Sequence, residues 1–134
     1  MIKTLSFSTR EKFQLIDLTD DVKEIVENSR VKNGLCIVYT PHATGAVIIN
    51  ESADPELKKD IIEKLEEIIP SNKNYRHDRI DNNAQAHIKT SLLSPSQTIP
   101  VVDGKLALGT WQAIFFAEFD GPRKRNLLVK VIEG

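Results

Sequence analysis

Three histidines stand where their imidazoles could do chemistry. His42 follows an apolar run within Pro41-His-Ala-Thr-Gly45, and His77 and His87 flank a stretch rich in aspartate and asparagine. Imidazoles beside carboxylates and amides can transfer protons, hold a divalent cation or orient a polar substrate. For His42 the alternative is a turn histidine bonded to the backbone. For the other two it is a polar loop whose side chains cap backbone groups, because their spacing matches no fixed zinc pattern.

Acidic and basic side chains also cluster near the end of the chain. Glu118 shares a predicted strand face with apolar residues, which is costly for a carboxylate that has no partner. Asp120 follows in an Asp-Gly-Pro turn, and Arg123 and Arg125 come next, two positions apart. The two guanidinium groups could grip the two carboxylates, or they could hold a phosphate in a fork geometry that lysine cannot supply. The sequence leaves both alternatives open.

The composition is that of an ordinary globular chain. With 134 residues, of which 40% are hydrophobic and 28% charged, it is predicted to form a single domain, 1–134, with a substantial core. A net charge of −1 gives no basic excess for nucleic acid, and no long apolar run indicates a membrane. The N-terminus lacks the apolar core of a signal peptide, and the single Cys36 is predicted to be a small buried residue. We therefore expect a cytoplasmic protein with neither a nucleic-acid nor a membrane partner.

Apolar periodicity predicts the elements of the first half of the chain. Alternation with period two indicates half-buried strands, and short runs that are apolar on both faces indicate strands covered on both sides. Asp before Pro is a helix start, because Asp can cap and Pro suits the first turn. In chain order we expect a hairpin of strands 2–9 and 13–18, a helix from Thr19 or Asp20 to about Val31, strands 35–40 and 46–50, and a helix from Asp54-Pro55 to Pro70.

The second half is predicted in the same way. It comprises an irregular stretch at 71–83, a helix at 84–93 with Ala84, Ile88 and Leu92 inward, a strand at 97–102 that returns at 105–108 through Asp103-Gly104, and strands 111–119 and 126–132 paired across the Asp120-Gly-Pro-Arg123 turn. The predicted fold class is therefore α+β, with mainly antiparallel sheets in a sandwich-like arrangement packed with two or three helices. Both faces of 111–119 carry large apolar groups, which favours association of several copies.

Taken in order, these residues resemble the YjbQ family, often called "secondary thiamine-phosphate synthase". The resemblance covers nearly the whole chain and is most specific near its end. The matching stretches are Pro41-His-Ala-Thr-Gly-Ala46, Asn50-Glu51, Asp60, Tyr75-x-His77, Asn83-x-x-Ala-His87, Gly104 to Gln112 and Glu118 to Arg125. Two places depart from the family pattern: the family usually has His-Thr-Thr-Ala at 42–45, and a Gly-x-Ser where this chain has Ser94-Pro-Ser96.

The resemblance implies a compact α+β domain that assembles as a homotrimer, a polar site near a subunit boundary, and a weak ability to make thiamine phosphate. That reaction joins a pyrimidine methyl diphosphate to a thiazole phosphate and releases pyrophosphate. It needs anions neutralised and the leaving group stabilised, usually with a divalent metal such as Mg or Zn. The expected ligand is a small phosphorylated metabolite.

Residue types then suggest roles at this site. His42, His87, Glu118 and Asp120 are the candidate catalytic groups, and His42, His77 and His87 are the candidate metal ligands. The candidate substrate-binding residues are Thr44, Asn83, Gln112, Arg123 and Arg125. Two alternatives to an enzyme remain: a non-catalytic binding module for a phosphorylated metabolite, and a structural trimer whose polar residues form interface bonds.

Overall fold

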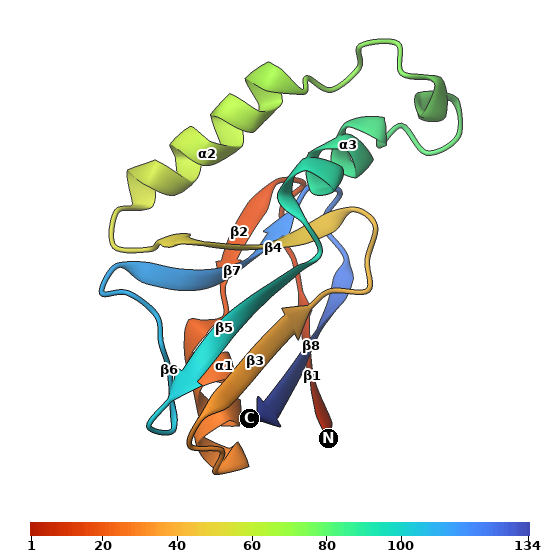
Figure 1. Cartoon of the computed structure of the whole chain (residues 1–134). Helices are drawn as coiled ribbons and strands as arrows, with labels where there is room; N and C mark the ends of the chain where they lie inside the picture. Colours follow the sequence, from red (N-terminus) through yellow and green to blue (C-terminus); the bar gives the residue numbers. More distant parts are fainter.

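The computed structural model describes all of residues 1–134 and contains two antiparallel sheets, three α-helices and one short 3-10 helix (Figure 1). In chain order the elements are β1 (Ile2–Ser8), β2 (Gln14–Asp17), α1 (Thr19–Ser29), β3 (Gly34–Tyr39), β4 (Gly45–Glu51), α2 (Pro55–Ile68), η1 (Arg76–Arg79), α3 (Ala84–Leu93), β5 (Ser96–Val102), β6 (Lys105–Leu106), β7 (Gln112–Glu118) and β8 (Lys124–Glu133). The predicted α+β class is confirmed.

The strands are divided between a five-stranded sheet, ordered β1-β8-β3-β5-β6, and a three-stranded sheet, ordered β2-β7-β4. Strands that follow one another in the chain therefore lie in different sheets, except for β5 and β6, which pair with each other. The expected hairpin of 2–9 with 13–18 is wrong, because β1 pairs with β8 and β2 pairs with β7. The expected pairing of 111–119 with 126–132 is wrong for the same reason, since the Asp120–Arg123 turn carries the chain from one sheet to the other.

The side chains of β7 point alternately into two buried clusters, one on each face of the three-stranded sheet. Ile114 and Phe116 face the five-stranded sheet and α1, in a buried cluster that includes Val22, Val38 and Leu127. The opposite face of the same strand supplies a second cluster, in which Ala113, Phe115, Ala117 and Phe119 pack beneath α2 and α3 with Leu65 and Ala86. The three-stranded sheet is thus the middle layer, buried on both faces as its sequence predicts.

Helix α2 begins as predicted, with the Asp54 carboxylate accepting a hydrogen bond from the Glu56 backbone N–H and Pro55 in the first turn. Helix α3 occupies the predicted residues, but the predicted orientation is wrong. Ile88 and Leu92 are exposed, whereas Gln85 and Lys89 are buried. The cause is the Lys89 ammonium, which lies 4.4 Å from the centroid of the Phe13 ring and bonds to Glu66 and Gln85 at 2.8 and 2.6 Å.

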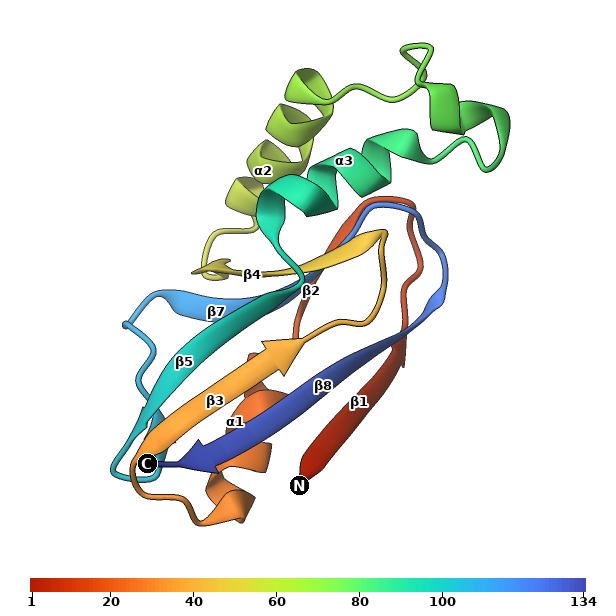
Figure 2. The same ribbon diagram turned by 45° about the vertical axis from the view of Figure 1, so that its right-hand side comes forward.

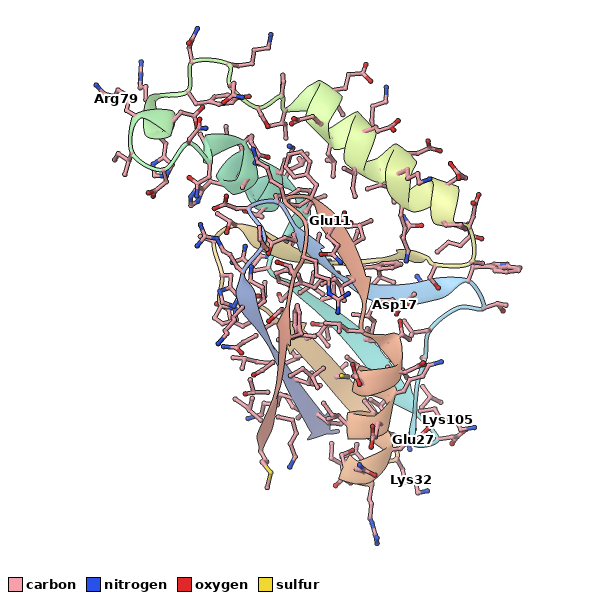
Figure 3. The ribbon with its side chains drawn as sticks, turned by 180° about the vertical axis from the view of Figure 1, so that it is seen from behind. Glu11, Asp17, Glu27, Lys32, Arg79 and Lys105 are labelled. Carbon is pink, nitrogen blue, oxygen red and sulfur yellow. The ribbon has the colours of Figure 1, made fainter.

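Helices α2 and α3 sit at one end of the molecule, and both chain termini lie at the other (Figures 1 and 2). Between the two helices the segment around η1 projects outward, and Arg79 lies at its outer end, far from Glu27, Lys32 and Lys105 (Figure 3). No helix has both the length and the apolar character needed to cross a membrane.

Candidate functional site

A hollow of about 410 Å³ lies between the β3–β4 connection and α3. Both sides of the hollow come from distant parts of the chain. Residues Tyr39 to Ala43, with Gly45, form one side, and His87, Thr90, Ser91 and Pro95 form the other. The two sides are tied together by Thr90, whose Oγ1 donates to the Ala43 carbonyl at 2.7 Å. The hollow therefore contains two of the three predicted histidines.

His42 is fixed by the backbone of β8. Its Nε2 accepts a hydrogen bond from the Asn126 N–H at 2.9 Å, which is the backbone-bonded alternative expected for a turn histidine. Burial lowers the pKa of His42 from its ordinary value of 6.5, the Arg125 guanidinium lowers it further, and Glu118 opposes the shift. Burial and Arg125 thus both favour the neutral form of the imidazole.

His87 and His77 lie edge to face, with ring centroids 4.8 Å apart and an interplanar angle of 84°. His77 comes from η1 and His87 from the first turns of α3, so the projecting segment folds back onto the helix at this point. The Nε2 atom of His77 is 3.9 Å from a carboxylate oxygen of Asp81. His87 thus stands between the hollow on one side and His77 on the other.

Glu118 and Arg125 form a buried ion pair behind His42. Arg125 Nε donates to Glu118 Oε1 at 2.8 Å, and its Nη2 donates to both Glu118 Oε2 and Thr44 Oγ1. Glu118 also accepts from Thr9 Oγ1 at 2.8 Å and from the Asp120 N–H at 3.0 Å. With Glu118 fully buried, these contacts form a clasp between four chain segments, and we call this set of residues the Glu118–Arg125 clasp.

Asp120, Asn83 and Arg123 form a second polar chain beside the clasp. Asp120 Oδ2 accepts from Asn83 Nδ2 at 2.8 Å and from Arg123 Nη2 at 2.9 Å. Both arginines are therefore paired with carboxylates, which is one of the two alternatives that the sequence left open. The Oδ1 atom of Asn83 is buried without a hydrogen-bond partner. An orphan acceptor of this kind costs about 1–3 kcal/mol.

The structure brings nearly all of the predicted residues to one end of the molecule, but only His42 and His87 line the hollow. Gln112 is the exception. It begins β7 while Glu118 ends it, and six strand residues span roughly 20 Å. Its Oε1 accepts from the Gly109 N–H at 2.8 Å, and within one chain it does not line the hollow, so its role in orienting a substrate stays a prediction.

The candidate metal ligands do not form a metal site in the chain. No group of three or more histidine, cysteine, aspartate or glutamate side chains lies close enough together to hold an ion. His42 has its Nε2 engaged by the backbone, and the His77 and His87 rings meet edge to face. Within one chain the three candidate ligands therefore do not come together as a site for the predicted Mg or Zn.

Sequence reasoning missed Thr9, Thr90 and Ser91. Thr90 and Ser91 follow His87 by three and four positions, so helical periodicity alone places them on its face. No local sequence pattern could have identified Thr9, because its partner Glu118 is 109 positions away in the sequence. Cys36 is a free thiol within the core, as predicted, and burial raises its pKa to about 11.

An antiparallel two-sheet α+β fold with a histidine-lined hollow under its third helix defines the structural class of this chain. Comparison with protein families matches residues 3–134 to "UPF0047 protein YjbQ-like". The chain belongs to the YjbQ/UPF0047 family, as its sequence motifs had indicated.

Relatives are found in archaea and bacteria. The chain is 47% identical to the UPF0047 protein MJ1081 of Methanocaldococcus jannaschii, over 98% of this chain and 94% of that protein. It is 39% identical to the UPF0047 protein YugU of Bacillus subtilis, over 98% and 99% of the two chains. Among solved structures, a YbjQ-like protein of unknown function from Sulfolobus solfataricus P2 superposes with a TM-score of 0.97 and 38% identity, over 100% of this chain and 97% of that one.

Proposed function

We propose that the hollow between the β3–β4 connection and α3 is a ligand site for a small phosphorylated metabolite. The observation that carries the proposal is the convergence of His42 and His87, 45 positions apart in the sequence, on one hollow of about 410 Å³. Sites for small molecules are concave, largely preformed and contain few polar groups, and this volume lies in their usual range of roughly 300–1,000 Å³.

The reaction that we propose for this site is the weak formation of thiamine phosphate suggested by the family resemblance. A carbon–nitrogen bond to the thiazole phosphate forms as the carbon–oxygen bond to pyrophosphate breaks. His87 would donate a proton to the leaving pyrophosphate, because its imidazole lines the hollow and no hydrogen bond engages its ring nitrogens in the structure. Glu118 would support His42 from behind without touching the substrate, since its oxygens are enclosed by the clasp.

A second function is favoured by the charge of the hollow. No lysine, arginine, aspartate or glutamate lines it, and the two nearby arginines are paired with carboxylates. Stabilising a departing pyrophosphate calls for cations or a metal. The same hollow is therefore also suited to a binding module that holds a phosphorylated metabolite without turning it over.

Calorimetric titration with the thiazole phosphate, followed by a turnover assay with both substrates, tests the proposal. His42→Ala and His87→Ala are compared with Leu92→Ala, an exposed α3 substitution outside the hollow. Loss of turnover in His87→Ala with affinity retained supports the enzyme, and trace turnover in the parent with measurable affinity supports the binding module. Affinity that survives in both histidine variants would place the ligand elsewhere.

We also propose that copies of the chain associate, as a homotrimer, through the outer face of the five-stranded sheet. Leu35 and Ile132 are direct neighbours across β3 and β8 and are 44% and 40% exposed, and Tyr39 on the same face is 41% exposed. No element of the chain covers this face, and contiguous exposed apolar patches commonly mark interaction surfaces.

A further inference from the structure

The hydrogen bond between His42 and β8 determines where the imidazole carries its proton. A backbone N–H can only donate, so the Nε2 atom that accepts from Asn126 at 2.9 Å must present a lone pair. A neutral imidazole has one protonated and one unprotonated nitrogen. The proton of His42 is therefore on Nδ1.

Two further hydrogen bonds hold Asn126 in place. Its backbone carbonyl accepts from Thr40 Oγ1 at 3.0 Å, and its side-chain Oδ1 accepts from Ser6 Oγ at 2.9 Å. Strand β8 pairs with β1 on one side at this residue, and the preceding residue, Arg125, is the centre of the clasp. The N–H that bonds to His42 thus belongs to a paired strand residue that also makes two side-chain-mediated hydrogen bonds.

Protonation of His42 at Nε2 is opposed from two directions. It would set a ring N–H against the Asn126 N–H, and it would place a cation close to the Arg125 guanidinium, whose effect outweighs that of Glu118. These are the charged groups that act on the ring. His42 therefore cannot readily take up a second proton while the strand stays in place.

Two hydroxyl groups that line the hollow can accept hydrogen bonds from a ligand, whereas His42 can donate one. Thr90 Oγ1 directs its proton to the Ala43 carbonyl at 2.7 Å, and Ser91 Oγ directs its proton to the His87 carbonyl at 2.8 Å. Both hydroxyls are left with lone pairs to offer a ligand, so they are acceptors. The lining of the hollow therefore combines these acceptors with His42, whose Nδ1–H is a donor.

We infer that His42 is locked as the neutral Nδ1–H tautomer and serves the hollow as a hydrogen-bond donor to an anionic or carbonyl oxygen of the ligand. It is neither a general base nor a metal ligand through Nε2. Metal binding through Nδ1 would require the proton to move to Nε2, against the Asn126 N–H. The donor role of His42 rests on the proposed function, because it requires a ligand in the hollow. The tautomer does not, because it follows from the hydrogen bond with Asn126.

Long-range ¹H–¹⁵N NMR of the imidazole rings in the intact protein tests this directly. The His42 signals are assigned by their loss in His42→Gln, whose side-chain oxygen can still accept from Asn126. We expect a protonated Nδ1 and an unprotonated Nε2 at about pH 8, which lies above the ordinary histidine pKa of about 6.5. We also expect added Zn²⁺ to leave both nitrogens unchanged, and inorganic phosphate to perturb Nδ1 more than Nε2.

The outcomes separate the inference from the proposed function. A protonated Nε2, or a Zn²⁺-induced shift of either His42 nitrogen, would overturn the inference even if the hollow binds phosphate. An Nδ1–H tautomer that ignores Zn²⁺ supports it. If phosphate causes no perturbation in that case, the ligand proposal fails while the tautomer stands. Phosphate that perturbs Nε2 more than Nδ1 would refute the donor role itself.

Discussion

At the residue scale, the charged side chains near the hollow are paired with one another, and the residues that line the hollow carry no lysine, arginine, aspartate or glutamate. The Glu118–Arg125 clasp satisfies a buried carboxylate with an arginine, a threonine hydroxyl and a backbone N–H. Burying a pair of this kind is costly, and it becomes tolerable when every oxygen is bonded. The sequence indicated that Glu118 needed a partner, and the clasp shows that the partner is structural.

Breaking one side of the clasp should destabilise the fold strongly. Arg125→Met leaves Glu118 buried without its cation, and we expect a loss of about 3–5 kcal/mol in the free energy of unfolding, measured by urea titration. The double variant Glu118→Leu with Arg125→Met removes both charges and should recover most of that loss. Lys64→Gln, which removes an exposed pair with Glu67, is the control and should change little. Additive losses in the double variant would show that the two side chains are not coupled.

The lowered pKa of His42 predicts a specific pH dependence of stability. Because the unfolded chain binds the His42 proton more readily than the folded one, stability is complete above the unfolded pKa of about 6.5 and falls as the pH drops through the folded pKa. Between about pH 7.5 and pH 5, spanning that value, the parent should therefore lose more unfolding free energy than His42→Gln. Equal losses in both proteins would contradict a depressed pKa.

At the scale of elements, the sequence predicted which helices and strands form far better than it predicted which strands pair with each other. Alternating residues in 2–9 and 13–18, and a run that is apolar on both faces in 111–119, identified strands, because both patterns are local properties. Pairing is not local: the Asp120–Arg123 turn is equally compatible with a hairpin and with the observed crossing between sheets. The inward face of α3 was misjudged because Lys89 is buried through contacts with Phe13 and Glu66, which lie far away in sequence.

At Gly45, the start of β4 passes close to the buried Phe116 ring of this chain. A Cβ added at Gly45 would lie 2.2 Å from Cζ of Phe116, a ring that is itself fully buried. We expect Gly45→Ala to cost about 1–3 kcal/mol of stability in thermal or urea unfolding, in line with overpacked cores. Gly109→Ala, where the nearest atom is the side-chain oxygen of Gln112 at 3.4 Å, should be nearly neutral. Similar effects at both positions would argue against tight packing at Gly45.

At the scale of the whole molecule, one large surface remains without a partner. The outer face of the five-stranded sheet exposes Leu35, Tyr39 and Ile132, while the opposite face of that sheet is core. The sequence predicted association from the apolar character of 111–119, but both faces of that strand are buried within one chain. The proposed association therefore uses the outer face of the five-stranded sheet and not strand 111–119, from which the sequence predicted it.

Sedimentation equilibrium tests this surface. We expect the parent to sediment as a trimer, and Leu35→Glu with Ile132→Glu to sediment as a monomer, because two charges would face an apolar contact. Ile68→Glu, an equally apolar change on the exposed side of α2, should leave the mass unchanged. A trimer that survives the double substitution would exclude this face as the interface, and a monomeric parent would exclude the association.

The central claim is that His42 and His87, brought together from distant segments, form the ligand site. The most direct measurement is a map of backbone amide chemical-shift changes as the thiazole phosphate is added to the intact protein. We expect changes concentrated in residues 39–45 and 87–95, which enclose the hollow. Changes centred on the opposite end near Glu27, Lys32 and Lys105, or no saturable change at all, would contradict it (Figure 3).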